Sequence, residues 1–527
     1  MRKEEFVITV ESKSRLAENI LCEKGMSVYD ALLQCGIPFQ APCGGNGTCT
    51  GCKIVVKNGA IPPSDRDRQV FTQEQLQEGM RLACKAYPQS DCTILVPEQE
   101  KFKAVTTCGN EEQKAVKVST PKDGQQDILV ALAIDLGTTT IVYKLFDILS
   151  GNDLAVFSTV NEQRKYGADV INRIQASNRG LREKMATELK EQMRRDIHNL
   201  LAEFSDGTFL QKIGLCGNTV MIHLLMGYSC EKLGIYPFEP VTLSGINSNT
   251  RELGILKESI PFIIMPGISA YIGGDVLMGL VLLSFDRCSE PTFFLDLGTN
   301  GEMALNDGKG HILVTSAPAG PAFEGGNISC GIGSVPGAIE KVNLNREQIC
   351  IRTIQDQVPV GICGSGVIET VYELRKEKII DEMGLLQDAY FETGFSLVKQ
   401  EKGRPQICMT QKDIREVQMA KSAIATAFEI LLERSHISRE EIVRVYLAGG
   451  FGYHIDVHKA AGIGIFPNEW ENRVIATGNT ALQGTKEFLM GNITEENINS
   501  CKAAAEEIYL SNEKEFEEIY LQNMYLK

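Results

Sequence analysis

Four cysteines near the start of the chain have a spacing that could hold a metal centre. Cys43, Cys49 and Cys52 form a C-x5-C-x2-C pattern within APCGGNGTCTGC, and Cys84 follows in RLAC. Each iron of a two-iron cluster needs two terminal sulfur ligands, which three thiolates from one tight loop and one distant thiolate would supply. The glycines of the loop let its backbone wrap closely around the sulfurs. The spacing therefore predicts a [2Fe-2S] cluster.

A zinc site is the alternative for these cysteines, because Cys49 and Cys52 alone would make one zinc knuckle. Zinc sites usually pair two such knuckles, and Cys84 has no second cysteine three positions away. The remaining cysteines are scattered, and free cysteine is among the most buried residue types, so we expect them to be structural. Cys330 and Cys363, beside glycine-rich segments, are the first two to test.

Two copies of Asp-Leu-Gly-Thr end apolar strands later in the chain, in ILVALAIDLGTTT and TFFLDLGTNG. The carboxylates of Asp135 and Asp296 could hold Mg²⁺ through water or orient an attacking water. Gly137 and Gly298 allow tight turns whose amides face phosphates. Further donors in the two turns are Thr138, Thr139, Thr140, Thr299 and Asn300. The repeat favours a phosphate site over the alternative, ordinary hairpin turns in an unrelated α/β protein.

A third glycine-rich strand end lies in VRVYLAGGFG. Without side chains at Gly449 and Gly450, a flat base or ribose can lie against the backbone. Glu324, in GPAFEGG, is a candidate second carboxylate, with a solvated or helix-capping glutamate as the alternative. His223 and His454 could face a ligand, although a lone histidine is more often structural.

The elements that position these residues divide the chain into two parts. Residues 1–97 contain an alternating strand (EEFVITV), a short helix, a strand after the glycine-rich loop and a final strand (CTILVP), which predict a small α+β domain. Residues 98–127 are mostly polar and predict a linker. Residues 128–527 alternate apolar strands, glycine-rich turns and amphipathic helices, which predict an α/β domain.

The large domain carries an internal duplication. The second DLGT copy begins a repeat at about residue 292, which predicts two similar half-domains that face each other. Helical periodicity predicts amphipathic helices at 183–203 and 413–433, and the acidic stretch 502–525 predicts a docked helix.

Composition narrows the class of protein. The chain has 527 residues, 43% of them hydrophobic and 23% charged, which indicates a folded protein of more than one domain. A formal charge of -15 argues against nucleic acid as a partner. The N-terminus MRKEEFVITV shows no signal-peptide pattern, and glycines, a proline and an aspartate interrupt the most apolar stretch. We therefore expect a cytoplasmic location and no membrane partner.

Both parts resemble known families. The cysteine spacing is similar to that of adrenodoxin-like ferredoxins, one residue longer than the plant-type pattern. The two DLGT turns and the Gly449 segment resemble the phosphate 1, phosphate 2 and adenosine motifs of the acetate and sugar kinase, Hsp70 and actin superfamily. Their fusion resembles one narrow family, the ATP-dependent reductive activators of corrinoid enzymes. Other segments that carry this resemblance are YGADVINRI, GNTVMIHLL, MPGISAYIGGD, FLDLGTNGE, GPAFEGGNISCG, GICGSG and TQKDIREVQMAK.

The resemblance implies a fold, a reaction and its cofactors. The fold would be a ferredoxin-like (β-grasp) domain followed by a duplicated ribonuclease-H-like domain of the actin type. The reaction would be the one-electron reduction of cob(II)alamin to cob(I)alamin on a corrinoid protein, with a [2Fe-2S] cluster, ATP and Mg²⁺. A low-potential reductant such as a ferredoxin or flavodoxin would supply the electron. The oligomeric state is open, with a homodimer as one option.

Three other functions remain open from the sequence alone. The chain could deliver electrons to another low-potential metalloenzyme, because acceptor recognition is a property of the surface. It could be a nucleotide-dependent redox sensor or scaffold, which would hydrolyse little ATP even with its partner present. It could also be a small-molecule kinase with an accessory ferredoxin, which would transfer phosphoryl groups to a sugar or an acid.

Overall fold

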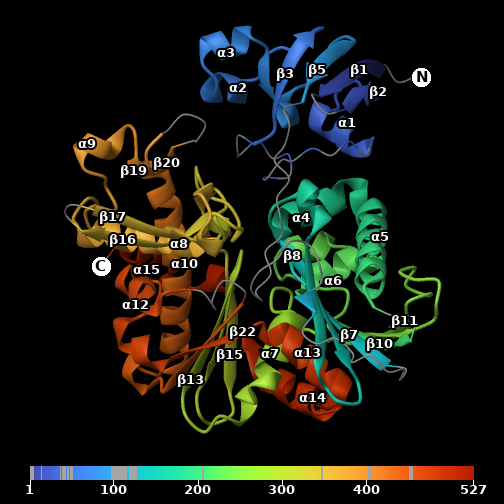
Figure 1. Ribbon diagram of the computed structural model, residues 1–527, viewed down its shortest axis with the longest axis vertical. Coiled ribbons are helices and arrows are strands. Elements are labelled where there is room, and N and C mark those ends of the chain that lie inside the picture. Colours follow the sequence, from blue (N-terminus) through green and yellow to red (C-terminus); the bar gives the residue numbers. More distant parts are fainter. Residues whose placement is uncertain are drawn as a thin grey trace. The chain divides into compact units, whose positions relative to one another are not determined.

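The computed structural model describes residues 5–12, 15–35, 37, 39, 43, 45, 47, 51–96, 116–117, 128–204, 207–345, 348–400, 406–449 and 455–526 (Figure 1). The chain divides into two compact units. Unit 1 comprises residues 1–102, 161–192 and 223–238, and unit 2 comprises residues 103–160, 193–222 and 239–527. Most of the predicted linker, 98–127, lies outside the described residues.

The N-terminal part of unit 1 is a five-stranded sheet with the order β2-β1-β5-β3-β4. Its strands are β1 (Glu5–Ser12), β2 (Arg15–Glu23), β3 (Lys53–Asn58), β4 (Met80–Leu82) and β5 (Cys92–Leu95). Strands β1 and β2 form an antiparallel pair, while β5 runs parallel to β1. Helix α1 (Val28–Gln34) begins at Ser27, whose hydroxyl accepts from the Asp30 N–H, and most of its residues are buried. The predicted ferredoxin-like fold is confirmed.

Short helices complete unit 1. They are α2 (Asp65–Val70), α3 (Gln73–Gln77), η1 (Ala83–Lys85), η2 (Glu162–Tyr166), α4 (Val170–Ala176), η3 (Ser177–Leu181) and η4 (Glu231–Gly234). Helix α5 (Arg182–Leu201) begins in unit 1 and ends in unit 2, close to the predicted 183–203.

Unit 2 contains the same strand arrangement twice, which confirms the predicted duplication. In the first copy, β7 (Ile128–Leu136), β8 (Thr140–Asp147) and β9 (Asp153–Val160) are antiparallel neighbours, and β10 (Thr208–Gly217) runs parallel to β7. In the second, the corresponding strands are β13 (Thr292–Leu297), β14 (Gly301–Asn306), β15 (Ile312–Ala317) and β21 (Arg444–Ala448). Each DLGT segment therefore links the first two strands of its sheet.

Further strands extend the two sheets. The first sheet adds β6 (Val116–Lys117), β11 (Ile246–Asn249) and β12 (Pro261–Ile264), and the second adds β22 (Val474–Gly478) and β23 (Ala505–Glu507). The two-residue strand β6 falls within the predicted linker and pairs antiparallel with β9. The helices of this part are α7 (Gly274–Leu282), η5 (Phe285–Arg287), α13 (Thr480–Met490) and α14 (Glu495–Ala504). Helix α6 (Thr219–Met226) begins in unit 2 and ends in unit 1.

A smaller subdomain follows β15. It consists of the sheet β17-β16-β18, the hairpin β19-β20 and the helices that pack on them. The strands are β16 (Ala338–Asn345), β17 (Gln348–Thr353), β18 (Gly361–Ile362), β19 (Phe395–Val398) and β20 (Ile407–Met409). The helices are η6 (Pro321–Glu324), η7 (Ile354–Asp356), α8 (Gly364–Lys376), α9 (Asp388–Phe391), α10 (Gln411–Ser435), η8 (Arg439–Glu441), α12 (Val457–Gly462) and η9 (Asn468–Arg473).

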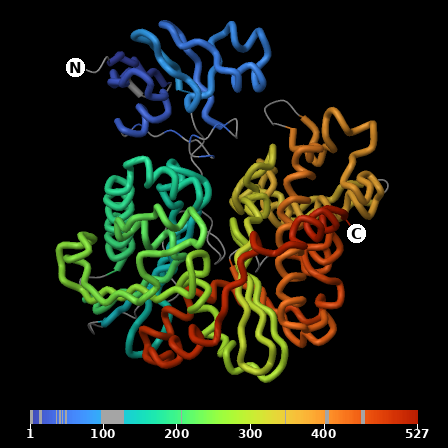
Figure 2. Tube along the Cα trace, turned by 180° about the vertical axis from the view of Figure 1, so that it is seen from behind, coloured from blue at the N-terminus to red at the C-terminus, as the bar shows by residue number. Residues whose placement is uncertain are grey.

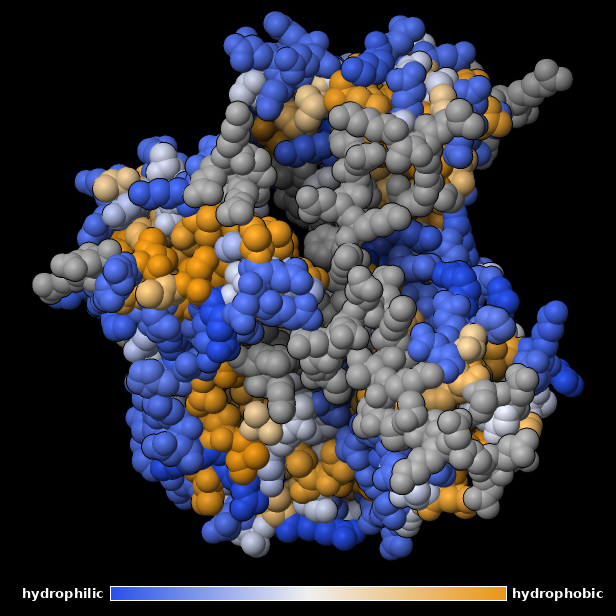
Figure 3. Space-filling model, in the orientation of Figure 1, coloured by the Kyte–Doolittle hydropathy of each residue, from blue (hydrophilic) through white to orange (hydrophobic). Residues whose placement is uncertain are grey.

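Helix α10 contributes many residues to the core of this subdomain. A capping box between Thr410 and Asp413 starts it, and His436 ends it in the left-handed conformation, with a φ of 55°. Its apolar residues belong to one large core that also includes Phe293, Phe323 and Trp470. On the outer face in Figure 3, hydrophobic side chains gather over β16 and β17.

The C-terminal segment corrects one prediction. A single docked helix over 502–525 is wrong, because the chain forms the end of α14, strand β23, η10 (Leu510–Asn512) and α15 (Phe516–Gln522). Strand β23 pairs in parallel with β15, and α15 packs on α10 (Figure 2). The free edge of the second sheet supplies hydrogen-bond partners that override the helical pattern.

Among the described residues, no helix combines the length and the apolar character that crossing a membrane would require.

Candidate nucleotide site and iron-sulfur centre

Two of the four predicted cluster cysteines lie in contact. The Sγ atoms of Cys52 and Cys84 are 3.3 Å apart, and both side chains are buried. The β3–β4 ladder aligns the two segments, since Lys53 is opposite Leu82 and the Ala83 N–H donates to the Cys52 carbonyl at 2.7 Å. The shared hydrogen bond lowers the pKa of Cys52 and raises the pKa of Cys84. Two thiols this close can bind one iron.

The described residues of the loop that precedes Cys52 are packed closely against their neighbours. Cys43 is buried, and a negative charge on its sulfur would raise the pKa of Cys52, so the two thiols are electrostatic neighbours. A Cβ on Gly45 would lie 2.7 Å from the Tyr29 ring, and one on Gly47 would lie 2.2 Å from Lys85 Cε. Both glycines have a φ above 80°, so only glycine fits these positions. Cys49 lies outside the described residues.

The two DLGT segments form tight turns of different length. The Gly137 N–H donates to the Thr140 carbonyl at 3.0 Å, and the Gly298 N–H donates to the Asn300 carbonyl at 2.9 Å. Asp135 and Asp296 occupy the corresponding position, next to last, in β7 and β13. The structure therefore places both predicted carboxylates at equivalent strand ends.

Glu324 bridges the two turns. The Oγ1 atoms of Thr139 and Thr299 are 3.3 Å apart. Thr139 donates to Glu324 Oε2 at 3.1 Å, and Thr299 donates to Glu324 Oε1 at 3.0 Å. Glu324 is the last residue of η6, after Gly320 and Pro321, which turn the chain toward the threonines. The structure thus brings together predicted residues from three distant segments.

Two asparagines that we did not predict support the turns. Asn218 follows β10, and its side-chain amide donates to Thr138 Oγ1 at 3.0 Å. Asn479 follows β22, and its amide donates to Asp135 Oδ2 at 2.7 Å. The side-chain oxygen of each asparagine accepts from the backbone N–H three residues later, at the start of α6 or α13. The sequence signal was the tripeptide Gly-Asn-Thr, which occurs after both strands.

Four buried carboxyl groups influence one another in unit 2. Burial raises the pKa of Asp135 to about 6 and the pKa values of Asp275 and Asp296 to about 7. Burial raises the pKa of Glu302 as well, and the charges of Asp275 and Asp296 raise it further. Asp275 and Glu302 were not predicted, although both belong to segments of the family resemblance. A bound cation would relieve the repulsion within this group.

The third predicted motif reaches the second turn. Gly449 follows β21, which pairs with β13 so that Ala448 lies opposite Asp296. Gly449 has a φ of 86°, and a Cβ there would lie 2.4 Å from Asp296 Oδ1. The backbone of this segment therefore packs directly on the carboxylate. Gly450 and His454 lie outside the described residues.

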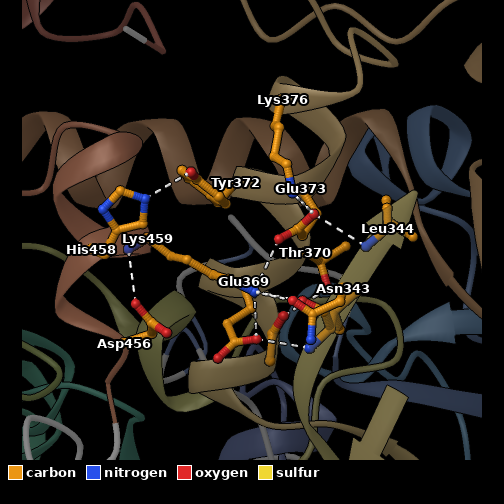
Figure 4. A network of polar contacts seen from close by, with 12 residues as sticks. Asn343, Leu344, Glu369, Thr370, Tyr372, Glu373, Lys376, Asp456, His458 and Lys459 are labelled. Atoms are coloured by element: carbon orange, nitrogen blue, oxygen red, sulfur yellow. Dashed lines mark hydrogen bonds and ion pairs between the residues drawn. The ribbon is translucent and has the colours of Figure 1, made fainter. Parts of the chain in front are cut away.

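A buried ion network holds the helix that follows this motif (Figure 4). The ammonium group of Lys459, in α12, lies 2.9 Å from Glu369 Oε2 and 3.1 Å from Glu373 Oε1. Both glutamates are on α8, and they also accept from the Val342 and Leu344 N–H groups of β16. One lysine therefore ties α12 to a helix and a strand.

Other candidates have structural contacts. His223 is fully buried, and its ring lies edge-on to Tyr228, with ring centroids 5.7 Å apart. The Cys363 thiol is buried and donates to the Ile339 carbonyl at 3.2 Å. Burial raises the pKa of Cys363, which favours the unreactive thiol form.

Three family profiles match the chain in succession. Residues 11–89 match "2Fe-2S iron-sulfur cluster binding domain", residues 130–288 match "RACo middle region", and residues 290–527 match "C-terminal domain of RACo the ASKHA domain". ASKHA denotes the acetate and sugar kinase, Hsp70 and actin superfamily, so the profiles agree with the duplicated fold.

Individual proteins are similar over most of the chain. The corrinoid activation enzyme RamQ of Eubacterium limosum is 27% identical, over 96% of this chain and 97% of its own length. The [Co(II) methylated amine-specific corrinoid protein] reductase of Methanosarcina barkeri is 26% identical, over 75% of this chain and 76% of its own. A solved structure, "Reductive activator for corrinoid,iron-sulfur protein", has a TM-score of 0.69 and 25% identity, over 99% of this chain and 98% of its own. The chain belongs to the RACo family, the reductive activators of corrinoid proteins.

Proposed function

We propose that this chain uses ATP to drive the one-electron reduction of cob(II)alamin to cob(I)alamin on a corrinoid protein. The observation that carries the proposal is that one chain combines the paired cysteines with two DLGT turns joined by Glu324. Corrinoid activation and reduction are the activities named for the two similar proteins. The partner follows from that similarity.

The cysteine loop would hold the cluster through Cys43, Cys49, Cys52 and Cys84. Such a cluster accepts and donates one electron at a time. The residues that surround the loop would exclude water from the cluster and limit the movement of the loop. Buried Tyr29 packs against the loop at Gly45, and Lys85 packs against it at Gly47. These contacts would help to hold the described residues of the loop in place around the iron.

The paired turns would hold the phosphates of ATP. The Gly137 and Gly298 turns and their threonine hydroxyls can donate to phosphate oxygens. Asp135 and Asp296 would hold Mg²⁺, in part through water, because no three ligating side chains converge among the described residues. Glu324 lies where it can orient a water molecule. If its hydrogen bonds to Thr139 and Thr299 break, the two hydroxyl groups can bind the nucleotide instead. Gly449 and Gly450 would face the adenosine.

ATP would be needed where the electron transfer is uphill. Plant-type two-iron clusters have potentials near about -400 mV. If the cobalt couple lies lower, each 100 mV costs roughly 2.3 kcal/mol for one electron. ATP can help only through differential binding to two conformations of the protein. A low-potential ferredoxin or flavodoxin would resupply the electron.

Two substitutions separate the two functions. In Cys84→Ser, we expect the [2Fe-2S] absorption and EPR signals to be lost while ATP still binds. In Asp296→Ala, we expect both signals to remain while ATP-dependent reduction of the corrinoid protein stops. The proposal fails if Asp296→Ala supports ATP-dependent reduction at the wild-type rate, or if anaerobically purified wild-type protein contains no iron and sulfide.

A further inference from the structure

Two cysteines meet where the segment after Glu324 contacts strand β20. The Sγ atom of Cys330 lies 3.7 Å from the carbonyl oxygen of Gln406. Cys408 stands two residues later in the chain, and Cys330 is near enough to raise the pKa of its thiol. Ile407 and Met409 are buried on one face of β20, so Cys408 points to the other face, where it is half-buried. Cys330 is half-buried as well.

Independent contacts hold the two segments in register. The backbone N–H and the hydroxyl of Ser329 donate to Asp413 Oδ1 at 2.7 and 2.9 Å. Asp413 belongs to the first turn of α10, which follows β20 directly, and its other oxygen accepts from Thr410. The Ile362 N–H donates to the Cys330 carbonyl at 2.9 Å. The two sulfurs are therefore kept next to each other by bonds that do not involve them.

We propose that Cys330 and Cys408 form a reversible disulfide that slows ATP hydrolysis under oxidising conditions. The oxidant is a small disulfide, such as oxidised glutathione. One thiolate attacks it to give a mixed disulfide and one small thiol, and the second cysteine then displaces the other small thiol. The chain loses two hydrogen atoms and two electrons, and one small disulfide becomes two small thiols.

The environment of Cys408 sets the order of the two steps. Burial and the neighbouring Cys330 together raise the pKa of the Cys408 thiol to about 11. Exchange starts from a thiolate, so this environment disfavours Cys408 as the first group to react. The mixed disulfide therefore forms at Cys330, and Cys408 closes the bond.

The bond would restrain Glu324 through a short, tightly folded segment. A Cβ on Gly331 would lie 1.9 Å from the Gly325 carbonyl oxygen, so the chain between these glycines folds back on itself. A crosslink at Cys330 would fix this fold to β20 and limit the movement of Glu324 relative to Thr139 and Thr299. The linkage itself is independent of the proposed function, but its effect on hydrolysis rests on it. An oxidised chain would then hydrolyse little ATP when no low-potential reductant is present.

The test is oxidation of the complete protein in glutathione buffers of increasing potential, without oxygen and with the cluster absorption monitored. After alkylation and digestion, mass spectrometry should find the peptides of Cys330 and Cys408 joined. ATP hydrolysis should fall at least about fivefold, a barrier change of roughly 1 kcal/mol. Dithiothreitol should restore it.

Single substitutions provide the controls. Cys330→Ser and Cys408→Ser should hydrolyse ATP normally and keep that rate in the oxidising buffer. Cys350→Ser removes an exposed cysteine of β17 and should remain sensitive. The proposal is overturned if no 330–408 linkage forms, or if the linked protein hydrolyses ATP as fast as the protein with free thiols. It is also overturned if oxidation slows ATP hydrolysis by Cys330→Ser as much as it slows the wild type. Absence of ATP hydrolysis in the reduced protein would instead contradict the proposed function, and the linkage would still be read by mass.

Discussion

At the scale of single residues, the paired asparagines show how the structure supports its phosphate turns. Asn218 and Asn479 each use the side-chain oxygen to start a helix and the amide to contact a DLGT turn. The contact of Asn479 is with a carboxylate, whereas that of Asn218 is with a hydroxyl. An amide that donates to a buried carboxylate favours its charged form.

Replacing Asn479 with aspartate tests this role. Asn479→Asp keeps a good helix N-cap but removes the donor to Asp135 and adds a negative charge next to it. We expect the rate of ATP hydrolysis to fall about tenfold or more, as it does when a residue that hydrogen-bonds to a metal ligand is replaced. Asn218→Asp, which faces the neutral Thr138 hydroxyl, should cost less. Equal rates in the two variants would contradict the assignment.

The buried carboxyl groups predict a dependence of stability on pH. Burial raises the pKa of Asp296 to about 7, from an ordinary value of 3.8. The folded state therefore binds more protons than the unfolded state between these values, and stability without nucleotide should fall as the pH rises toward 7. Asp296→Asn should raise the melting temperature at pH 8 by about 3 °C or more, and much less at pH 5. Added Mg²⁺ should stabilise the wild type more than the variant at pH 8. A variant that melts below the wild type at pH 8 would contradict this prediction.

At the scale of elements, the Lys459 network joins α12 to α8 and β16. Removing the lysine would leave Glu369 and Glu373 buried without their shared cation. Breaking a buried ion pair in this way costs several kcal/mol, whereas an exposed pair contributes little.

Lys459→Met should lower the free energy of unfolding by about 3 kcal/mol. The matched control is Lys376→Met, because Lys376 contacts the same Glu373 from a side chain that is 49% exposed. We expect the control to cost less than about 1 kcal/mol. Urea denaturation of both variants makes the comparison, and similar losses would show that the network does not hold α12.

The sequence predicted helices and strands correctly where the local hydrophobic pattern agrees with the final fold. The DLGT repeat correctly predicted two similar sheets, and periodicity predicted α5 and α10 within a few residues. It failed at residues 502–525, because a helical pattern does not reveal that the edge of a distant sheet will pair with β23. It also missed Asp275, whose significance lies in its proximity to Asp135 and Asp296 after folding. The contact between Glu324 and the two threonines depends on the same folding.

At the scale of the whole molecule, one chain contains a ferredoxin-like domain and a duplicated ASKHA domain. The family profiles cover these parts in succession, which supports a single protein that combines electron transfer with nucleotide use. Neither part alone predicts the reaction. The proposal therefore depends on the coupling of the two parts.

The most direct measurement of this coupling is the absorption of cob(I)alamin on a corrinoid protein, followed without oxygen in the presence of one low-potential reductant. With ATP and Mg²⁺, the wild-type chain should produce the cob(I)alamin band while phosphate is released. Without ATP, and in Cys84→Ser with ATP, the band should be absent. A band of equal size with and without ATP would contradict the central claim.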